Sequence, residues 1–600
     1  MNIQESTKPR NSVKKSDTWD LEKIYKSEKL WENDFKQIQE MIKGYKEFIN
    51  KLGTDAETLK KCLDFDTELN RKFEKLGSYA FLTHSQDVIS TNGQNMVSRY
   101  HTLGANAVEA SSFITPEILA IPKKRFETLQ NDPLLKKYKR VLDRIIRSKK
   151  YVLNKNEERL LALQSEVANS SSTIFRQIND GDLKFGSVKT GDGNIDLSHS
   201  TWGLFLENPD RNIRKKAFEK MFLKYGEFEN SFASIYNSSI KQNVFMAKAR
   251  NYNSAIERSL FKDNVPLKVY EQLIETVKDN IKINHRYLNL VKKSLKIKEL
   301  HFYDTYVPLV PSVNWKMTYD KAVKTIIGAV APLGIDYTKK LEPGLTTKRW
   351  VDRYENQGKR SGAFSSGGYD TPPYIMMNYK EESLQGIYTL AHEAGHSMHT
   401  MLSAANQDFV DYDYPIFVAE VASTFNEQLL TKHLLSTVKD KNMKAYLIDR
   451  EINQIRNTLI RQTMFAEFEK VSHEIVEKGE PLTKDRLKQE YKKLLEVYFG
   501  ENFKIDESLT MEWARIPHFY SAFYVYKYAT GLTAAIALSE KVLKKEKDAQ
   551  KRYLNFLKSG ASKFPLDLLK DAGIDLTDRQ PVSTVMARMD TLITELESLL

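Results

Sequence analysis

The residues whose types and spacing most clearly suggest catalysis or metal binding form one short motif, His392-Glu393-Ala394-Gly395-His396. Positions i and i+4 of a helix lie about 40° apart around its axis and one turn apart along it, so both imidazoles face one side. Two imidazole nitrogens can then hold one Zn²⁺, while Glu393 lies beside the first of them as a general base. With 11 histidines in 600 residues, about 0.03 such motifs are expected by chance, so the spacing favours a metal site over ordinary helix histidines.

A third histidine, His399, follows on the same face of this helix. It lies seven residues after His392, a rise of ~10.5 Å along a straight helix, which exceeds the span of one tetrahedral site. The spacing therefore predicts that His399 packs structurally or supports a ligand by a hydrogen bond. The third ligand has to come from another element.

Acidic residues follow in the segment DYDYPIFVAEVASTFNEQLL, where a proline marks the start of a second helix. Glu420 stands 24 residues after His396, which leaves room for this helix to fold back antiparallel to the first. We predict Glu420 as the third ligand and Glu427, seven positions further on the same face, as its support. The reverse assignment stays open, as does a role for Asp411 or Asp413, which precede the helix.

Three protein ligands leave one coordination position for water, which distinguishes a catalytic zinc from a structural one. Zn²⁺ lowers the pKa of water from ~15.7 towards ~7, and Glu393 can accept the proton as the water attacks a carbonyl. The resulting oxyanion needs further hydrogen-bond donors. The segment IPHFYSAFYVYKYATG offers His518 with one or two tyrosines, although an aromatic core helix is the alternative for most of these tyrosines. The candidates are His518, Tyr520, Tyr524, Tyr526 and Tyr528.

The elements that must position these residues are predicted to be mostly helices. Glycine and proline are scarce, 25 and 17 in 600 residues, whereas sandwiches and propellers need turn residues every ~8–12 positions. Two stretches depart from the helical pattern. DLKFGSVKTGDGNIDLSH predicts a β-hairpin within 181–200, and RSGAFSSGGYDTPPYIMMNY predicts a flexible loop and a short strand over 360–379. A helix that carries the histidine motif is expected to begin near Ser383.

Glycines gather around the histidine motif. Six of the 25 fall between Leu345 and Thr400, four of them in the loop over 358–368. Gly395 stands between the two motif histidines, where the absence of a side chain permits close packing. The clustering predicts that backbone segments approach each other closely around the metal site.

Composition and charge exclude several classes of protein. At 41% hydrophobic residues the chain is too apolar for disorder, and it contains no apolar run long enough for a membrane span. Its single cysteine, Cys62, cannot form an internal disulfide. A net charge of +12 is dilute over 600 residues and includes no block of five or six like charges. We therefore expect no nucleic-acid and no membrane partner.

Several motifs together resemble the thimet oligopeptidase-like family of zinc metallopeptidases, most closely its oligoendopeptidase F branch. They are HEAGHSMH with FVAEVASTFNE, WDLEKIY at 19–25, YVPL at 306–309, YENQGKRSGAFSSGGYDTPPYIMMNY at 354–379 and HFYSAFYVYKYATG at 518–531. The resemblance spans essentially the whole chain after residue 17. It implies a mainly α, two-lobed fold with a deep central substrate channel and a few short β-strands at the cleft.

The resemblance also implies a set of site residues. One Zn²⁺ per chain is implied, bound by His392, His396 and Glu420, with Glu393 as the base. His518 and Tyr526 match the oxyanion-stabilising group of the family, and Tyr520 and Tyr524 match it less directly. The glycine-rich segment that borders the substrate contributes Gly367, Gly368 and Tyr369.

The sequence suggests a division of the chain and a compartment. Residues 1–17 are polar and lack the apolar stretch of a secretory signal, so we expect a disordered tail and a cytoplasmic location. We expect a helical N-terminal lobe over 18–205 that ends in the hairpin, and a catalytic domain over 206–600.

Three functions are compatible with these features. The leading one is a zinc endopeptidase that cleaves internal bonds of short oligopeptides. A zinc carboxypeptidase or dipeptidyl carboxypeptidase of the same helical type would instead require a free C-terminus. A non-enzymatic basic helical scaffold would show a basic stripe and would have no use for a complete metal motif. The sequence leaves the oligomeric state open.

Overall fold

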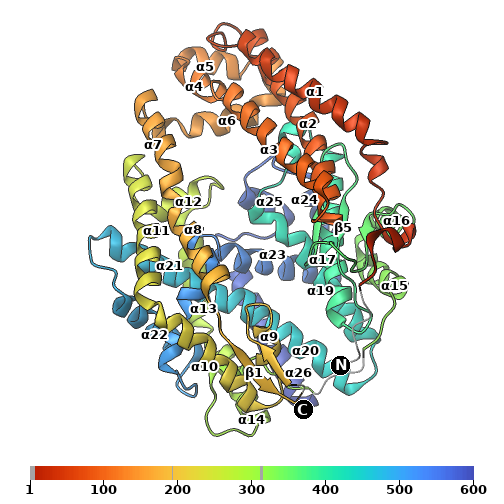
Figure 1. Cartoon of the computed structure of the whole chain (residues 1–600), viewed down its shortest axis with the longest axis vertical. Helices are drawn as coiled ribbons and strands as arrows, with labels where there is room; N and C mark the ends of the chain where they lie inside the picture. Colours follow the sequence, from red (N-terminus) through yellow and green to blue (C-terminus); the bar gives the residue numbers. More distant parts are fainter. Residues whose placement is uncertain (1–6, 192, 311–314) are drawn as a thin grey trace. The chain divides into compact units, whose positions relative to one another are not determined.

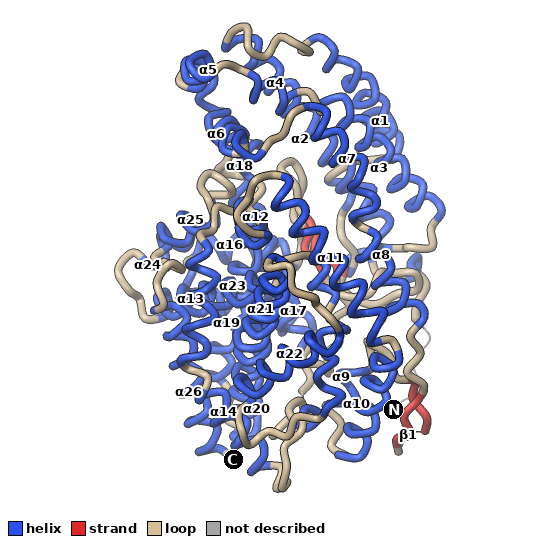
Figure 2. The backbone as a smooth tube through the Cα atoms, turned by 90° about the vertical axis from the view of Figure 1, so that its left-hand side faces the viewer, coloured by secondary structure: helices blue, strands red, loops and turns tan. Residues whose placement is uncertain are grey.

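The structure is a computed structural model that describes residues 7–191, 193–310 and 315–600. Within these residues it contains 26 α-helices and five short strands, linked by short turns and 3-10 segments (Figure 1). Figure 2 shows helices throughout, with strands confined to small regions. The mainly α fold with a few short strands that the sequence predicts is therefore confirmed. No helix in the described part of the chain combines the length and apolar character that crossing a membrane requires.

The chain forms two compact units, and each is built from three separate stretches. The first unit comprises Met1–Lys150, Asn314–His433 and Leu538–Gly573, and the second comprises Tyr151–Val313, Leu434–Ala537 and Ile574–Leu600. The sequence predicts contiguous segments divided at 205/206, whereas the units interleave. The physical reason is shared burial: Tyr374 and Met376, far along the chain, belong to the same hydrophobic cluster as the N-terminal helices.

The first unit consists of helices of varied length and one three-stranded sheet. Its elements are α1 (Glu28–Ile42), α2 (Ala56–Gln86), α3 (Thr91–Ser111), α4 (Ile114–Ala120), α5 (Lys123–Gln130), α6 (Lys139–Arg147), α15 (Tyr319–Val330), α16 (Ile335–Leu345), β3 (Val351–Asp352), β4 (Phe364–Ser366), β5 (Tyr374–Met376), α17 (Leu384–Ala404), α18 (Phe409–Tyr412), most of α19 (Ile416–Thr437), α24 (Ala549–Lys558) and α25 (Pro565–Ala572).

The second unit is helical apart from one hairpin. Its elements are α7 (Lys155–Ala168), α8 (Ser170–Arg176), β1 (Ser187–Thr190), β2 (Gly193–Asp196), α9 (Trp202–Leu206), α10 (Arg211–Glu227), α11 (Glu229–Ala249), α12 (Ala255–Phe261), α13 (Leu267–Asp279), α14 (Lys282–Ser294), α20 (Lys441–Ile455), α21 (Arg461–Glu477), α22 (Lys484–Phe499), most of α23 (Tyr526–Leu543) and α26 (Gln580–Leu599).

Both strand regions lie where the sequence predicts them. β1 and β2 pair antiparallel from Ser187 opposite Asp196 to Thr190 opposite Gly193, which confirms the hairpin, although Asp192 of its turn lies outside the described residues. In the first unit the strand order is β3-β5-β4, with β3 parallel and β4 antiparallel to β5. β5 is central and buried, and β4 is left at an edge of this sheet.

The two helices expected to hold the metal are largely buried within the first unit. α17 begins directly after Ser383, as predicted, and α19 begins directly after Pro415. Buried side chains lie on every side of α19, including Val418, Val421 and Phe425, which is typical of a helix enclosed by its neighbours. Figure 1 shows α17 and α19 side by side next to β5.

The sequence predicts a disordered tail over 1–17, and the structure describes residues 7–17 of this segment. Residues 1–6 lie outside the described part, but Arg10–Ser12 and Lys15–Asp17 form short 3-10 turns. The guanidinium of Arg10 binds the buried carboxylate of Asp352 at 2.5 and 3.0 Å, and the carboxylate of Asp17 binds Arg353 at 3.0 Å. These ion pairs attach residues 10–17 to the chain around β3, and no local sequence pattern predicts them.

Candidate metal centre

Gly395 brings the two helices of the site close together. A Cβ atom at this position would lie 2.5 Å from the carbonyl oxygen of Ala422 and 2.6 Å from the Cα of Ser423. The Asn426 amide donates to the carbonyl of Ala391 at 3.2 Å one turn further along. Contacts move backwards along α19 as they move forwards along α17, so the helices are antiparallel, as the sequence predicts.

This helix pair brings His392, His396 and Glu420 together. Their ligand atoms all lie within 4.8 Å of one another. The carboxylate Oε2 of Glu420 lies 3.4 Å from Nε2 of His392 and 3.5 Å from Nε2 of His396. A tetrahedral site with bonds of ~2.1 Å separates its ligand atoms by ~3.4 Å. Two imidazole nitrogens and one carboxylate oxygen at these distances fit a zinc ion.

Glu427 lies behind the site rather than in it. Its carboxylate accepts a hydrogen bond from Nδ1 of His392 at 2.7 Å. With the proton of His392 on Nδ1, the lone pair of Nε2 faces Glu420 and is free to bind a metal. Glu420 thus lies with the two imidazole nitrogens at the spacing of metal ligands, whereas Glu427 contacts His392 at its other ring nitrogen.

The pKa values of Glu393 and Glu420 are shifted in opposite directions. Burial raises the pKa of Glu393 above its ordinary value, and the charges of His392 and His396 only partly oppose this shift. Burial also acts to raise the pKa of Glu420, but its hydrogen bonds and charge interactions with the same two histidines outweigh burial and lower that pKa. At neutral pH Glu420 is therefore ionised, as a ligand must be, while Glu393 is the better proton acceptor.

His399 lies one turn beyond the site and takes part in packing. It is 1% exposed, and its ring stacks on Tyr414 with centroids 3.6 Å apart and planes 4° apart. Burial lowers the pKa of His399 to about 3, so the ring is neutral.

The glycine-rich segment is anchored next to these helices. A Cβ on Gly367 would lie 3.1 Å from Thr400 Cγ2 of α17. The backbone N–H of Tyr369 donates to the Glu74 carboxylate at 2.7 Å, and a Cβ on Gly368 would lie 2.7 Å from the same carboxylate. Sequence reasoning missed Glu74, because it stands in the middle of α2, almost 300 residues earlier, with no motif around it.

One hydroxyl pair links the sheet edge to α17. Ser365 of β4 and Ser397 of α17 lie 2.8 Å apart through their Oγ atoms. Ser397 directly follows His396, so β4 is fixed in register with the site. The sequence carries no spacing signal for this contact.

The candidate oxyanion donors all belong to the second unit. His518 and Tyr520 lie in the 3-10 helix Pro517–Tyr520, and Tyr526 begins α23. The His518 Nε2 atom lies 3.1 Å from the Tyr528 hydroxyl, and the Tyr524 ring is nearly parallel to the His518 ring, 5.9 Å away. Burial lowers the pKa of His518, which favours a neutral ring.

The other two tyrosines of this segment are packed more firmly. Tyr526 is 1% exposed, and its ring centroid lies 5.0 Å from that of Tyr270. The ring of Tyr520 stacks on Phe175 at 4.4 Å. These contacts favour the aromatic-core interpretation for Tyr526. His518, Tyr524 and Tyr528 form a half-buried group. The sequence identifies all three as candidates, but it does not predict the hydrogen bond between Tyr528 and His518.

Known proteins resemble this chain over its full length. Residues 204–588 match the sequence profile of peptidase family M3, and residues 117–185 match that of oligopeptidase F. An oligoendopeptidase F homolog of Borreliella burgdorferi is 40% identical over 577 residues, covering 96% of this chain and 97% of the relative. The oligopeptidase PepF of Bacillus subtilis is 39% identical, covering 98% and 88%.

A solved structure agrees with these matches. The crystal structure of oligoendopeptidase-F from Enterococcus faecium superimposes with a TM-score of 0.75 at 32% sequence identity. The match covers 95% of this chain and 99% of that structure. The sequence matches and the superimposed structure therefore point to the same relatives, the oligopeptidase F proteins.

Proposed function

Because the chain belongs to peptidase family M3, in its oligopeptidase F branch, we propose that it is a zinc-dependent endopeptidase that hydrolyses internal peptide bonds of short oligopeptides. The observation that carries the proposal is the convergence of His392, His396 and Glu420 at the spacing of a tetrahedral site. This donor set suits Zn²⁺, and three protein ligands leave one position for a reactant. When bound, such an ion lowers the pKa of water towards ~7 and polarises a carbonyl oxygen.

Glu393 is proposed as the general base. It adjoins the first ligand in sequence, and its burial raises the pKa of its carboxyl group, which makes it a stronger proton acceptor. It takes the proton of the attacking water and then delivers it to the leaving amine. Glu427 keeps the proton of His392 on Nδ1 throughout.

The substrate is proposed to bind in extended form along β4. This strand is at the edge of its sheet, so its outer side can add an extended peptide by backbone hydrogen bonds. The Ser365–Ser397 contact ties β4 to the helix that carries the histidines. Gly367, Gly368 and Tyr369 follow directly and are proposed to continue this surface.

His518 is proposed to donate a hydrogen bond to the oxyanion, with Tyr524 or Tyr528 as its partner. Its hydrogen bond to the Tyr528 hydroxyl on Nε2 allows Nδ1 to carry a proton as a donor. Tyr526 was the tyrosine matched by resemblance, but its burial against Tyr270 favours a packing role.

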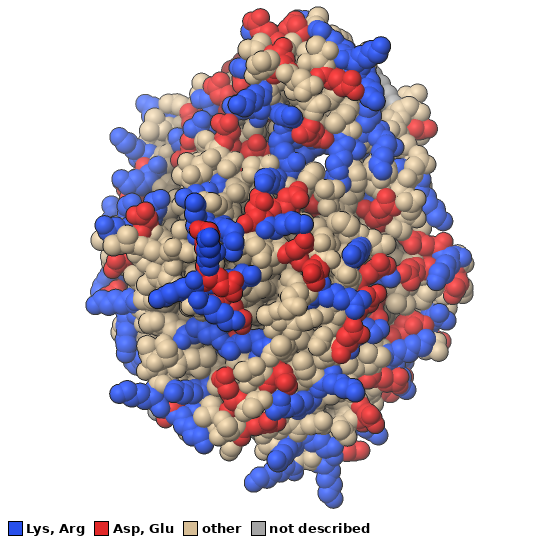
Figure 3. All heavy atoms as spheres, turned by 180° about the vertical axis from the view of Figure 1, so that it is seen from behind, with Lys and Arg blue, Asp and Glu red and all other residues tan. Residues whose placement is uncertain are grey.

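A non-enzymatic basic scaffold has less support. On the face shown in Figure 3, lysine and arginine side chains are interspersed with acidic ones and form no continuous stripe. Such a scaffold would also have no need for the metal motif. The carboxypeptidase alternative is separated by experiment.

The test compares the wild-type protein with Glu393→Gln on an internally quenched peptide of about ten residues that is blocked at both ends. Loss of the base should lower turnover ~10²–10⁴-fold, while metal analysis still finds about one zinc per chain. Glu382→Gln is the matched control, because Glu382 is exposed and its ion pair, with Lys316 at 3.4 Å, is exposed as well. Unchanged turnover of Glu393→Gln would refute the assigned base, and cleavage only of peptides with a free C-terminus would refute the endopeptidase.

A further inference from the structure

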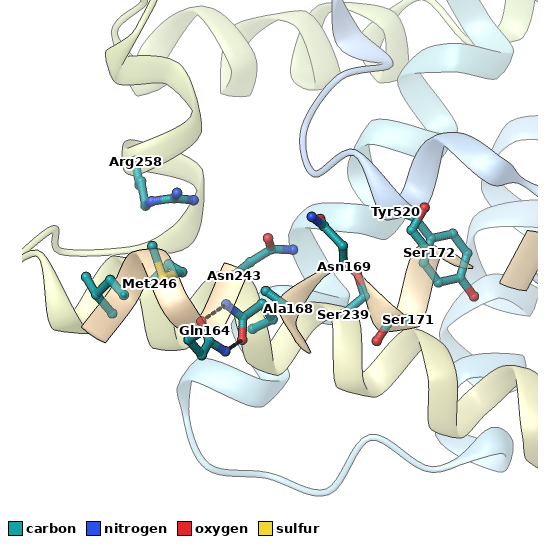
Figure 4. Close-up of a pocket in the computed structure, with 12 residues that line it drawn as sticks. Gln164, Ala168, Asn169, Ser171, Ser172, Ser239, Asn243, Met246, Arg258 and Tyr520 are labelled. Carbon is teal, nitrogen blue, oxygen red and sulfur yellow. Dashed lines mark hydrogen bonds between the residues drawn. The ribbon is translucent and has the colours of Figure 1, made fainter. Parts of the chain in front are cut away.

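A polar cavity of about 230 Å³ lies within the second unit. α7, α8, α11 and α12 form its walls, and Tyr520 closes one end (Figure 4). Amides and hydroxyls dominate the lining. Among the lining side chains that the structure describes, Arg258 is the one that carries a charge, and none is acidic. The cavity is therefore suited to a polar ligand of negative charge.

Arg258 differs from Arg250 in its surroundings. Among the side chains that the structure describes, which exclude those of residues 155, 165 and 166, none forms an ion pair or hydrogen bond with its guanidinium group. Arg250, eight residues earlier, instead binds both carboxylate oxygens of Glu158 at 2.7 and 2.8 Å. Burial and the charge of Arg250 lower the pKa of Arg258. A half-buried cation without an acid is unfavourable, and a ligand carboxylate would remove this cost.

Amide groups complete the arrangement around Arg258. Figure 4 shows Asn169 and Asn243 extending into the same space as the guanidinium group. Gln164 and Gln242 bind each other reciprocally at 2.8 and 3.1 Å, so their amides are held against the cavity wall. A planar guanidinium fork with amide donors beside it matches the geometry of a carboxylate.

We propose that this cavity is a subsite that binds a carboxylate group of the oligopeptide substrate through Arg258. The inference rests on the proposed function. Tyr520, which lines the cavity, stands two residues after His518, the proposed oxyanion donor. The carboxylate has two sources in a peptide, the free C-terminus and the side chain of an aspartate or glutamate. Both present the same chemistry to the guanidinium group.

The test measures KM and kcat of the full-length protein and its Arg258→Gln variant on four internally quenched decapeptides. The peptides combine a free or amidated C-terminus with Glu or Gln at one internal position. Arg258→Gln should raise KM about 10–100-fold for the peptides that carry the recognised carboxylate and leave kcat nearly unchanged. Arg258→Lys should restore part of the affinity. Arg176→Gln is the control for loss of one positive charge, because Arg176 is exposed at the end of α8 and does not line the cavity.

The pattern across the four peptides decides the outcome. An effect that follows the C-terminal carboxylate, or one that follows the glutamate, supports the subsite and identifies the source. An equal effect on all four peptides, or no effect on any, overturns it. Binding of the four peptides, measured by fluorescence anisotropy, uses the same variants and needs no turnover. Failure of the proposed hydrolysis is thereby distinguished from failure of the subsite.

Discussion

Each unit of the molecule places a glutamate next to a helix histidine, but the two histidines have different hydrogen-bond partners. In the first unit, Nδ1 of His392 binds the carboxylate of Glu427 at 2.7 Å. In the second unit, Nδ1 of His473 binds the backbone carbonyl of Glu469 at 2.8 Å, and its Nε2 lies 3.3 Å from the Asn243 amide. The same residue types therefore give one ring that is ready for a metal and one that is fully used by neutral groups.

The difference lies in where the carboxylates stand. Glu427 is on α19, opposite His392, and Glu420 approaches the other ring nitrogen from the same helix. Glu469 and His473 share α21, and the carboxylate of Glu469 accepts the backbone N–H of Phe523 instead, at 2.9 Å. A metal site of this kind thus needs carboxylates that a second helix brings close to the histidines. A histidine and a glutamate on the same helix do not by themselves form one.

Gly395→Ala should have the largest effect on this contrast. The added Cβ would meet backbone atoms of Ala422 and Ser423 at 2.5 and 2.6 Å, so α17 and α19 must separate. We expect a loss of about 3 kcal/mol in the free energy of unfolding, measured by denaturant titration, and weaker zinc binding because Glu420 moves away from the histidines.

Gly226→Ala is the matched control for this change. Outside the backbone of its own helix and its two chain neighbours, a Cβ on Gly226, in α10, would meet no described heavy atom within 4 Å. Alanine there should stabilise the protein by ~0.5–1 kcal/mol because it favours the helix. If Gly395→Ala behaved like Gly226→Ala, close approach of α17 and α19 would not be what builds the centre.

Glu427→Gln should have the next largest effect. The change gives His392 an amide partner, like the Asn243 partner of His473, and removes the carboxylate that fixes the proton on Nδ1. Loss of such a supporting group weakens metal binding by ~10–100-fold, which a competition titration with a zinc chelator measures. Glu420→Gln removes a ligand and should weaken binding further. An equal or larger loss for Glu427→Gln would mean that the two glutamates have exchanged roles.

The candidate metal centre could be predicted from the sequence because its residues lie close together along the chain. His392, Glu393 and His396 share one helical turn, and Glu420 lies one helix further along the chain. The glycine between the histidines indicated close packing, and its contacts with α19 confirm that. The helical fold followed for a similar reason, since the scarcity of glycine and proline acts on every segment alike.

Features built from distant residues could not be predicted. Glu74 reaches Tyr369 across 295 positions, and the ion pair of Arg10 with Asp352 spans 342. The cavity around Arg258 brings together α7, α8, α11 and α12, and no spacing in the sequence encodes it. The interleaved units have the same origin, because side chains from separate stretches share one core.

Glu469→Gln tests the pair formed by Glu469 and His473 in the second unit, through the pH dependence of the free energy of unfolding. Burial raises the pKa of Glu469 to about 8, although its hydrogen bond with Phe523 opposes the shift. The folded protein therefore holds a proton on Glu469 that the unfolded chain releases above about pH 4.5, so stability falls as pH rises from there to about 8. Burial lowers the pKa of His473 to about 4, which makes stability rise between about pH 4 and 6.5.

The two effects oppose each other below about pH 6.5, and only the effect of Glu469 remains between about 6.5 and 8. The tyrosines that face this cluster, Tyr236 and Tyr270, have pKa values raised well above 10 and do not titrate there. Wild-type stability should therefore fall by about 2 kcal/mol more than that of Glu469→Gln across this window, measured by denaturant titration at both limits. Glu474→Gln, a half-exposed position on the same helix, should keep the wild-type decrease. A decrease of the same size in Glu469→Gln would mean that this carboxyl group is ionised in the folded protein, and the contrast with the metal centre would then rest on geometry alone.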